Sequence, residues 1–427
     1  MRFPTAAAAY ILLPTLVFSA TSASAEPTSR GAKLTRGDML ARVKQENLAL
    51  LAAKHRVSEA RAEVVSAGVW TNPNVSLSSI LLTHGAVTGG KTELVASVDQ
   101  VLPIGGQPGL KRDVAKGFLT AEERSFEATA WQLASDAKLA YLELQRAEAR
   151  AKAVRTGLED LGRVETIVKE RTAAGAGSTY DLVRVSAERS KLEGRRAQSD
   201  VDVTSAQAGL AVAVGKSIDA RTVSVADPLE EPPDAPSDVD ALVRRALAQR
   251  PEVGSARARA DASEMRIAAL KRQYIPSPDL SVGYGRYFNV AGTPGHPDGG
   301  ALVLGLSLPI PLLDHGQGTV DRGVAAAAEE RANRDATELT IQRQVEQAAS
   351  AMAVRVEAWR HFREVGAKDL PRLRQIAELS YKEGKASILE LLDAYATSLD
   401  GAERTIELQV AASRSVLDLE RALGPER

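Results

Sequence analysis

The sequence predicts an α+β membrane protein in which strands from several chains share one pore and very long helices continue from it. Three observations support this fold class. Four short anchors recur in the same order, shifted by about 205 to 209 positions; one helical stretch carries a heptad seam; and short segments alternate apolar and polar residues with a period of two. The recurrence indicates an internal duplication.

Composition excludes several classes of protein. The chain has 427 residues, with 54 basic against 55 acidic side chains and no cysteine. This balance does not fit a basic nucleic-acid binder. Without cysteine the chain has no disulfide framework, no thiolate metal site and no lipid attached to an N-terminal cysteine.

The N-terminal segment, residues 1–25, has the features of a signal peptide. Arg2 is followed by an apolar stretch over residues 6–20, and Ala23-Ser24-Ala25 provides small residues at a cleavage site. A retained anchor is the alternative. Beyond this segment no apolar run approaches the roughly 20 residues of a spanning helix. We therefore expect an exported protein without a transmembrane helix.

The duplication divides the remaining chain into a first repeat at 26–225, a linker at 226–238 and a second repeat at 239–424. The matching anchors are Pro73 with Pro278, Pro103 with Pro309, Ser178 with Ser387, and Gly215 with Gly424. The linker holds four prolines, which forbid a continuous helix.

Each repeat is expected to contain a helix, a strand pair and a long helical hairpin broken once by glycine. The first helices are predicted at 36–70 and 239–274, and the hairpin tips near 172–178 and 382–387. The first long stretch has a heptad seam typical of coiled packing. Its members are Leu119, Phe126, Leu133, Ala140, Ala147, Val154, Leu161 and Val168, with Ala130, Ala137, Leu144, Ala151 and Leu158 between them. A weaker second seam is formed by Val345, Ala349, Met352, Val356, Trp359, Leu370, Leu373 and Ala377.

Strands are predicted at 73–83, 92–104, 278–288 and 301–311, because apolar residues alternate there over about ten positions. A soluble four-stranded sheet on helices explains the alternation equally well. Export and the very long helices favour a membrane barrel. Four strands are too few to close a barrel, and an open edge cannot lie in hydrocarbon, so several chains must contribute.

These residues resemble the TolC-like outer-membrane efflux proteins. The resemblance rests on the repeated element order, on NPN and PSPD at the starts of the strand pairs, and on LPIGG and LPIPL after them. It implies a homotrimer in the outer membrane of a Gram-negative bacterium, with a twelve-stranded β-barrel continuous with a periplasmic α-helical coiled-coil barrel. It further implies a periplasmic adaptor and an inner-membrane pump of the RND type as partners. PIGGQPGLKR is most similar to the heavy-metal, CzcC-like branch.

The glycine breaks are the tips of the helical hairpins, where the resemblance implies contact with the adaptor. The residues concerned are Gly175, Gly177, Ser178, Gly384 and Ser387. Glycine permits the positive φ of such a turn, and a serine hydroxyl caps the next helix. A hairpin turn with no further role accounts for the same residues.

Glu390 and Asp393 lie three positions apart on the helix that leaves the second tip, so they share one face. In a monomer they would be a solvated face, favourable near a helix N-terminus. In a trimer, six carboxylates would surround one axis and attract cations. The resemblance implies that these positions form a periplasmic gate.

Tyr381 and Asp181 match positions that, in the family, join neighbouring hairpins and hold the gate shut. A hydrogen bond from the Tyr381 hydroxyl to the Asp181 carboxylate is therefore expected. The sequence departs from the family at Ala386, where better-known relatives have arginine. Lys385 and Arg184 are the candidate substitutes for this latch residue.

The resemblance implies a passive transport duct with no enzymatic activity and no cofactor. A type I protein secretion channel and a periplasmic coiled-coil scaffold or adhesin are alternatives. A glycosidase using the two acids is disfavoured, since they lie on a long helix rather than in a pocket, and no GxSxG, HExxH or phosphate loop occurs.

Overall fold

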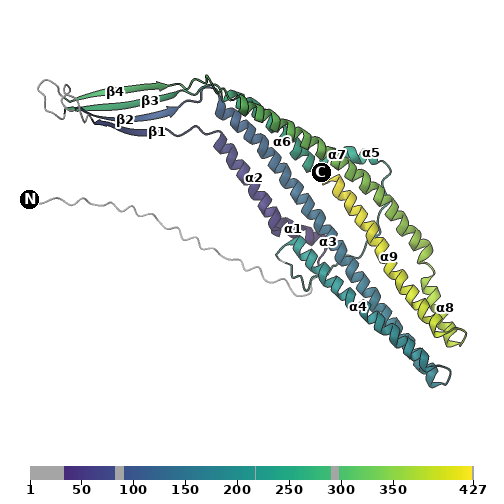
Figure 1. Ribbon diagram of the computed structural model, residues 1–427. Coiled ribbons are helices and arrows are strands. Elements are labelled where there is room, and N and C mark those ends of the chain that lie inside the picture. Colours follow the sequence, from purple (N-terminus) through teal and green to yellow (C-terminus); the bar gives the residue numbers. More distant parts are fainter. Residues whose placement is uncertain (1–32, 82–90, 217, 290–297, 426–427) are drawn as a thin grey trace, which may run out of the picture.

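A computed structural model describes residues 33–81, 91–216, 218–289 and 298–425. The molecule is elongated, with a four-stranded sheet at one end and long helices that run to two hairpin tips at the other (Figure 1). The order of helix pair, strand pair and long helical hairpin occurs twice along the chain. The predicted signal peptide lies outside the described residues.

The strands form one antiparallel sheet in the order β1-β2-β3-β4. They are β1 Asn74–Leu81, β2 Lys91–Val101, β3 Asp279–Asn289 and β4 Gly299–Ser307. β2 and β4 end earlier than predicted, two residues before Pro103 and Pro309, because proline has no N–H to donate to a strand ladder. Among the described strands β1 and β4 each pair on one side only, so both edges of the sheet are open.

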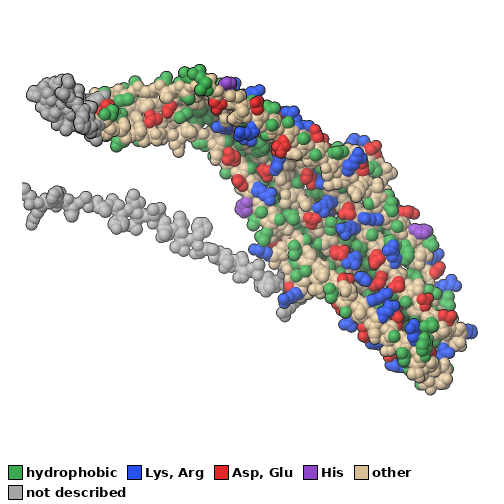
Figure 2. Space-filling view, viewed as in Figure 1, with side chains coloured by type: hydrophobic (Ala, Val, Ile, Leu, Met, Phe, Trp, Pro, Cys, Tyr) green, Lys and Arg blue, Asp and Glu red, His purple; other side chains and the backbone are tan. Residues whose placement is uncertain are grey.

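The two faces of the sheet differ in polarity. One face exposes a row of large apolar side chains, among them Val75, Leu77, Val98, Val282, Leu302, Leu304 and Leu306, while the other exposes only Ile80 and Val101 among the described large apolar residues. On the other face Ser76 Oγ lies 2.7 Å from Ser97 Oγ and donates to Asp99 Oδ2 at 3.2 Å. Charged side chains are dense over the helices and sparse over the strands (Figure 2). This division of polarity is typical of strands with lipid on one side and water on the other.

The helices of the first repeat are α1 Arg36–Glu46, α2 Leu48–Ala67, α3 Gln107–Ala173 and α4 Thr179–Val214. The single helix predicted over 36–70 is divided at Asn47, whose Oδ1 accepts the N–H of Ala49 at 2.9 Å and so caps α2. Asn47 Nδ2 also donates to the carbonyl of Ala213 at 3.0 Å. α2 therefore begins where α4 ends, and both pack along α3.

The second repeat contains α5 Val239–Gln249, α6 Pro251–Arg272, α7 Gln317–His361, a π-helical turn η1 Phe362–Gly366, α8 Leu370–Lys382 and α9 Ile388–Leu423. The helix predicted over 239–274 is divided at Arg250, since a residue before proline disfavours the helical conformation. The prediction of one glycine break per hairpin is wrong here, because η1 interrupts the path before the tip. None of the described helices combines the length and apolar composition needed to cross a membrane.

The predicted heptad seam forms much of the helical core. In α3 seven of its nine members from residue 137 to 168 are buried, and Ala140 and Leu158 are partly buried. The buried members are Ala137, Leu144, Ala147, Ala151, Val154, Leu161 and Val168. The second seam is buried from Val345 to Trp359. Its predicted continuation at Leu373 is wrong, since this side chain is 42% exposed. The break at η1 changes the phase of the helix and turns Leu373 out of the seam.

The predicted linker, residues 226–238, contains neither helix nor strand and lies across the helices; we call it the strap. Gln145 of α3 donates to the carbonyl of Asp227 at 2.8 Å, and Gln409 of α9 donates to the carbonyl of Glu230 at 3.2 Å. Side-chain amides thus satisfy backbone groups of a segment that has no ladder of its own.

Candidate functional site

The first tip is a tight turn between α3 and α4. Gly175 has φ 76°, a conformation that favours glycine. A Cβ on Gly177 would lie 2.8 Å from the backbone nitrogen of Thr172, so the close approach of the chain also requires glycine there. The Ser178 hydroxyl accepts the N–H of Tyr180 at 3.0 Å and caps α4.

The second tip repeats this geometry between α8 and α9. Gly384 has φ 75°, and the N–H of Lys385 donates to the carbonyl of Ser380 at 2.8 Å. Ser387 and Glu390 form a reciprocal capping box: the Ser387 N–H donates to Glu390 Oε2 at 2.7 Å, and the Glu390 N–H donates to Ser387 Oγ at 3.3 Å. Glu390 therefore has a structural role in starting α9.

Tyr381 connects the two hairpins just above the tips. Its hydroxyl donates to Asp181 Oδ2 at 3.0 Å, so the expected hydrogen bond is present within one chain. The side chain is 1% exposed, and this burial, with the bond to Asp181, raises the pKa of Tyr381 to about 12. The phenol stays neutral and donates its proton at all ordinary pH values.

The cation beside this pair is Arg171 of α3. Its Nη1 donates to the carbonyl of Tyr381 at 2.6 Å, and its guanidinium carbon lies 4.7 Å from the centre of the Tyr381 ring. The two candidate latch residues lie elsewhere. Lys385 pairs with Glu383 at 2.6 Å, and Arg184 is exposed and has no partner among the described residues of the chain. Sequence reasoning thus missed Arg171, because nothing in its local pattern marks a contact with α8.

Glu390 and Asp393 lie on one exposed face at the start of α9. Leu391, Leu392 and Ala394 beside them are buried against the other helices. The Asp393 carboxylate has no partner within the described part of the chain. The structure therefore leaves at least one carboxylate per chain free to face solvent at the tip.

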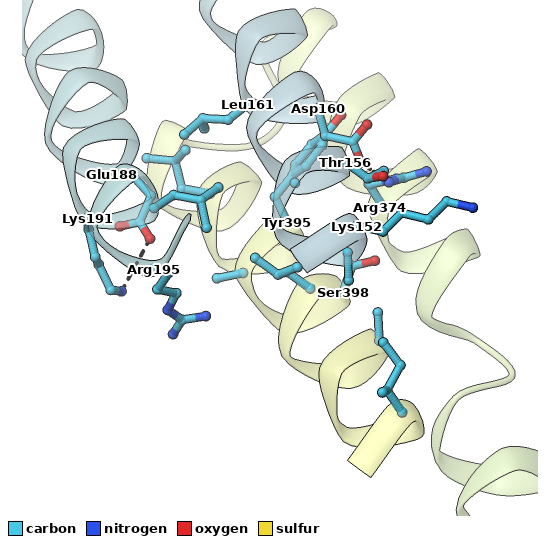
Figure 3. A pocket seen from close by; sticks show the side chains of 18 of the residues that line it. Lys152, Thr156, Asp160, Leu161, Glu188, Lys191, Arg195, Arg374, Tyr395 and Ser398 are labelled. Atoms are coloured by element: carbon cyan, nitrogen blue, oxygen red, sulfur yellow. Dashed lines mark hydrogen bonds and ion pairs between the residues drawn. The ribbon is translucent and has the colours of Figure 1, made fainter. Parts of the chain in front are cut away.

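A second cluster lies further from the tips, beside a cavity of about 380 Å³ between α3, α4 and α9 (Figure 3). Asp160 of α3, only 5% exposed, forms ion pairs with Arg163 and with Arg374 of α8. The Tyr395 hydroxyl of α9 donates to Glu378 of α8 at 3.2 Å. Sequence reasoning did not single out this cluster. Asp160 lies between the seam residues Leu158 and Leu161, at heptad position c and not at the e or g positions that commonly form interhelical ion pairs, so the seam gave no signal for it.

Comparison with known proteins supports the resemblance. Residues 242–425 match the sequence model of the family described as Outer membrane efflux protein. The resemblance to outer-membrane efflux proteins is confirmed. The outer-membrane location expected from the sequence agrees with this match. Over the described residues, no group of three or more His, Cys, Asp or Glu is arranged to hold a metal ion.

Two curated relatives are metal-resistance proteins. The chain is 23% identical to nickel-cobalt-cadmium resistance protein NccC of Alcaligenes xylosoxydans xylosoxydans, over 66% of this chain and 62% of that protein. It is 20% identical to cobalt-zinc-cadmium resistance protein CzcC of Cupriavidus metallidurans, over 93% of this chain and 92% of that protein. Among solved structures, the outer-membrane channel OprN matches with a TM-score of 0.73 and 20% identity, over 93% of each chain. This likeness establishes the fold.

Proposed function

We propose that three copies of the chain form a passive channel through the outer membrane and that the channel is gated at its periplasmic tips. The observation that carries the proposal is the sheet. It has one apolar exposed face, one polar face and two open edges. In hydrocarbon an unpaired edge is not tolerated, and four strands do not close. Pairing of β4 with β1 of the next copy solves both problems, and three copies supply twelve strands.

The helices support the same assembly. Across the chain, α2 and α4 lie at one side of α3, and α7 and α8 lie at the far side of α6 and α9. Both outer sides expose apolar residues, among them Val183, Val201, Ile376 and Leu379. These surfaces suit the neighbouring copies of a closed helical tube.

We propose divalent metal cations as the cargo, delivered by an inner-membrane pump of the RND type and a periplasmic adaptor that contacts the tips at Gly175 and Gly384. The support is the naming of NccC and CzcC for resistance to nickel, cobalt, cadmium and zinc. Glu390 and Asp393 of three copies would surround the axis and favour cations over anions.

Conductance of the purified protein in a planar bilayer tests the proposal. We expect channels of low conductance that prefer cations. Glu390→Gln combined with Asp393→Asn removes both charges, while glutamine still completes the capping box. The preference for cations should weaken in this variant and persist in Glu383→Gln, which changes an acid of the same tip. Absence of channels in the wild type would refute the duct, and unchanged selectivity in the double variant would refute only the acidic gate.

A further inference from the structure

We propose that α8 is a hinged segment, that η1 is its hinge, and that the ion pair between Arg374 and Asp160 holds it closed against the first hairpin. The proposal rests on the gated channel proposed above and names the part of the chain that moves.

The hydrogen-bond ladder of the second hairpin is interrupted at η1. The N–H of Ala367 donates to the carbonyl of Phe362 at 2.8 Å, a five-residue π spacing. Pro371 follows at the start of α8 and has no N–H to donate. The i to i−4 hydrogen bonding of an α-helix resumes only at Leu373, whose N–H donates to the carbonyl of Asp369 at 2.9 Å. Such interruptions are where long helices bend.

The end of α7 and the start of the hinge are anchored to the strap. Arg360 at the end of α7 pairs with Asp234, and Arg363 of η1 pairs with Glu231 of the strap at 2.7 Å. The Arg363 guanidinium also lies 4.4 Å from the centre of the buried Trp359 ring. Motion at η1 is therefore confined to the segment that follows it.

The segment after the hinge has little apolar burial of its own. Tyr381 is the one fully buried side chain of α8, while Leu373, Ile376 and Leu379 are between 42% and 53% exposed. At the hinge, Leu370 packs against Gly401 of α9, where a Cβ would lie 2.2 Å from the Leu370 Cδ1. Contacts within the chain therefore hold α8 only weakly. In the proposed trimer Ile376 and Leu379 also face the neighbouring copy, and opening breaks that contact as well.

Polar contacts with the first hairpin hold α8 in place at two levels. At the tip they are the bonds of Tyr381 to Asp181 and Arg171. Nearer the hinge the contact is Arg374 with Asp160, on the wall of the cavity, and Figure 3 shows the two side chains close together. An ion pair to a carboxylate this buried is worth more than an exposed pair, because solvent screens it less.

Arg374→Gln tests this lock, and besides the ion pair it removes the guanidinium that lies 5.7 Å from the centre of the Tyr395 ring of α9. Asp160 keeps its ion pair with Arg163 in the variant, so no buried carboxylate is left unpaired. Arg372→Gln is the matched control, because Arg372 lies on the same helix, is exposed, and has no partner among the described residues.

Hydrogen exchange of the intact detergent-solubilised protein measures the hinge directly. We expect the amides of 370–382 to exchange at least about tenfold faster than those of 161–173 in α3. Arg374→Gln should accelerate exchange in α8 by a further factor of about ten, leaving α3 unchanged, and Arg372→Gln should have no effect. The proposal would be overturned if α8 and α3 exchanged at the same rate in the wild type. It would also be overturned if α8 exchanged at the same rate in Arg374→Gln and Arg372→Gln.

Bilayer recordings separate this proposal from the proposed function. If the wild type conducts and Arg374→Gln is open more often than both the wild type and Arg372→Gln, the lock controls the gate. If the wild type conducts and Arg374→Gln matches it, the lock is refuted and the channel stands. If the wild type does not conduct, the channel is refuted, and so is the proposal that the hinge controls its gate.

Discussion

The two hairpins of the chain follow one plan but differ in the helix that leads to the tip. α3 runs without interruption for 67 residues, whereas its counterpart is divided into α7, η1 and α8. The two paths span nearly the same number of residues: Gly175 lies 69 positions after Gly106, the N-cap of α3, and Gly384 lies 68 positions after Gly316, the N-cap of α7. The hairpins therefore differ in the continuity of this helix and not in its length, since the second path contains the π turn and the break before Pro371.

The first hairpin, whose helices are uninterrupted, is the fixed part, and the segment beyond the break at η1 is the part that we propose to move. The residues proposed for the gate, Glu390 and Asp393, and the connecting Tyr381 all lie beyond the break. The first hairpin supplies partners from uninterrupted helices, Asp181 for Tyr381 at the tip and Asp160 for Arg374 of α8 further up. The break in the second repeat thus gives the two hairpins the asymmetry on which the proposed gate rests.

The largest effect on stability is expected from a break introduced into α3 at the level where the second hairpin is naturally broken. Gly162 of α3 lies 209 positions before Pro371, so Gly162→Pro places a proline at the corresponding level. We expect a loss of about 3 kcal/mol in the free energy of unfolding, because proline removes a helical hydrogen bond and clashes with the preceding turn. The urea midpoint of the detergent-solubilised protein measures it.

Gly162→Ala is the control for this variant. A Cβ at Gly162 meets no atom within 4 Å, so alanine should be neutral or stabilise by about 0.5 to 1 kcal/mol. If Gly162→Pro were tolerated as well as Gly162→Ala, the continuity of α3 would have no structural importance and the comparison would fail.

An intermediate effect is expected at the contact between the hairpins. Tyr381→Phe removes the hydrogen bond to Asp181 and should cost about 1.5 kcal/mol. Because the pKa of Tyr381 is raised from its ordinary value of 10 to about 12, the folded state favours the neutral phenol. Its contribution is complete below pH 10 and is lost as the pH rises from 10 to 12.

Stability curves against pH test this contribution. The raised pKa values of Tyr141 and Tyr395, each about 12, add to the same alkaline loss, so Tyr381→Phe should remove only a part of it. Tyr180→Phe, at an exposed tyrosine beside the first tip, should leave the curve unchanged. An identical alkaline loss in Tyr381→Phe and the wild type would show that this phenol is not held neutral by folding.

Sequence patterns predicted the features that depend on local periodicity. The four strands, the seam of α3 and both glycine tips follow from spacing along the chain, since side-chain direction repeats every two residues in a strand and every 3.6 in a helix. The break at η1 was not predicted, because a shift in the phase of the heptad pattern appears in the sequence only as a weaker seam. Leu373 was assigned to the core for this reason.

The partners of the candidate site could not be predicted in the same way. Tyr381 and Asp181 were paired only through a family resemblance, and Arg171 and Arg374 were not identified at all. Each contact joins helices that lie about 200 positions apart in the chain. Which cation reaches which carboxylate depends on the rotation of both helices, and local pattern does not fix that rotation to within one side chain.

The smallest effect is expected where the strap meets the hinge. Glu231→Gln removes the ion pair with Arg363 but leaves the guanidinium over the Trp359 ring. Both charged groups are partly exposed, so the loss should stay below about 1 kcal/mol at low salt and disappear near 1 M salt. Glu364→Gln, which changes an exposed acid of η1 with no partner in the described chain, should have no effect at either salt concentration. A loss that persists at high salt would mean that Glu231 supports the strap by packing or hydrogen bonding, and that the anchor of the hinge is not electrostatic.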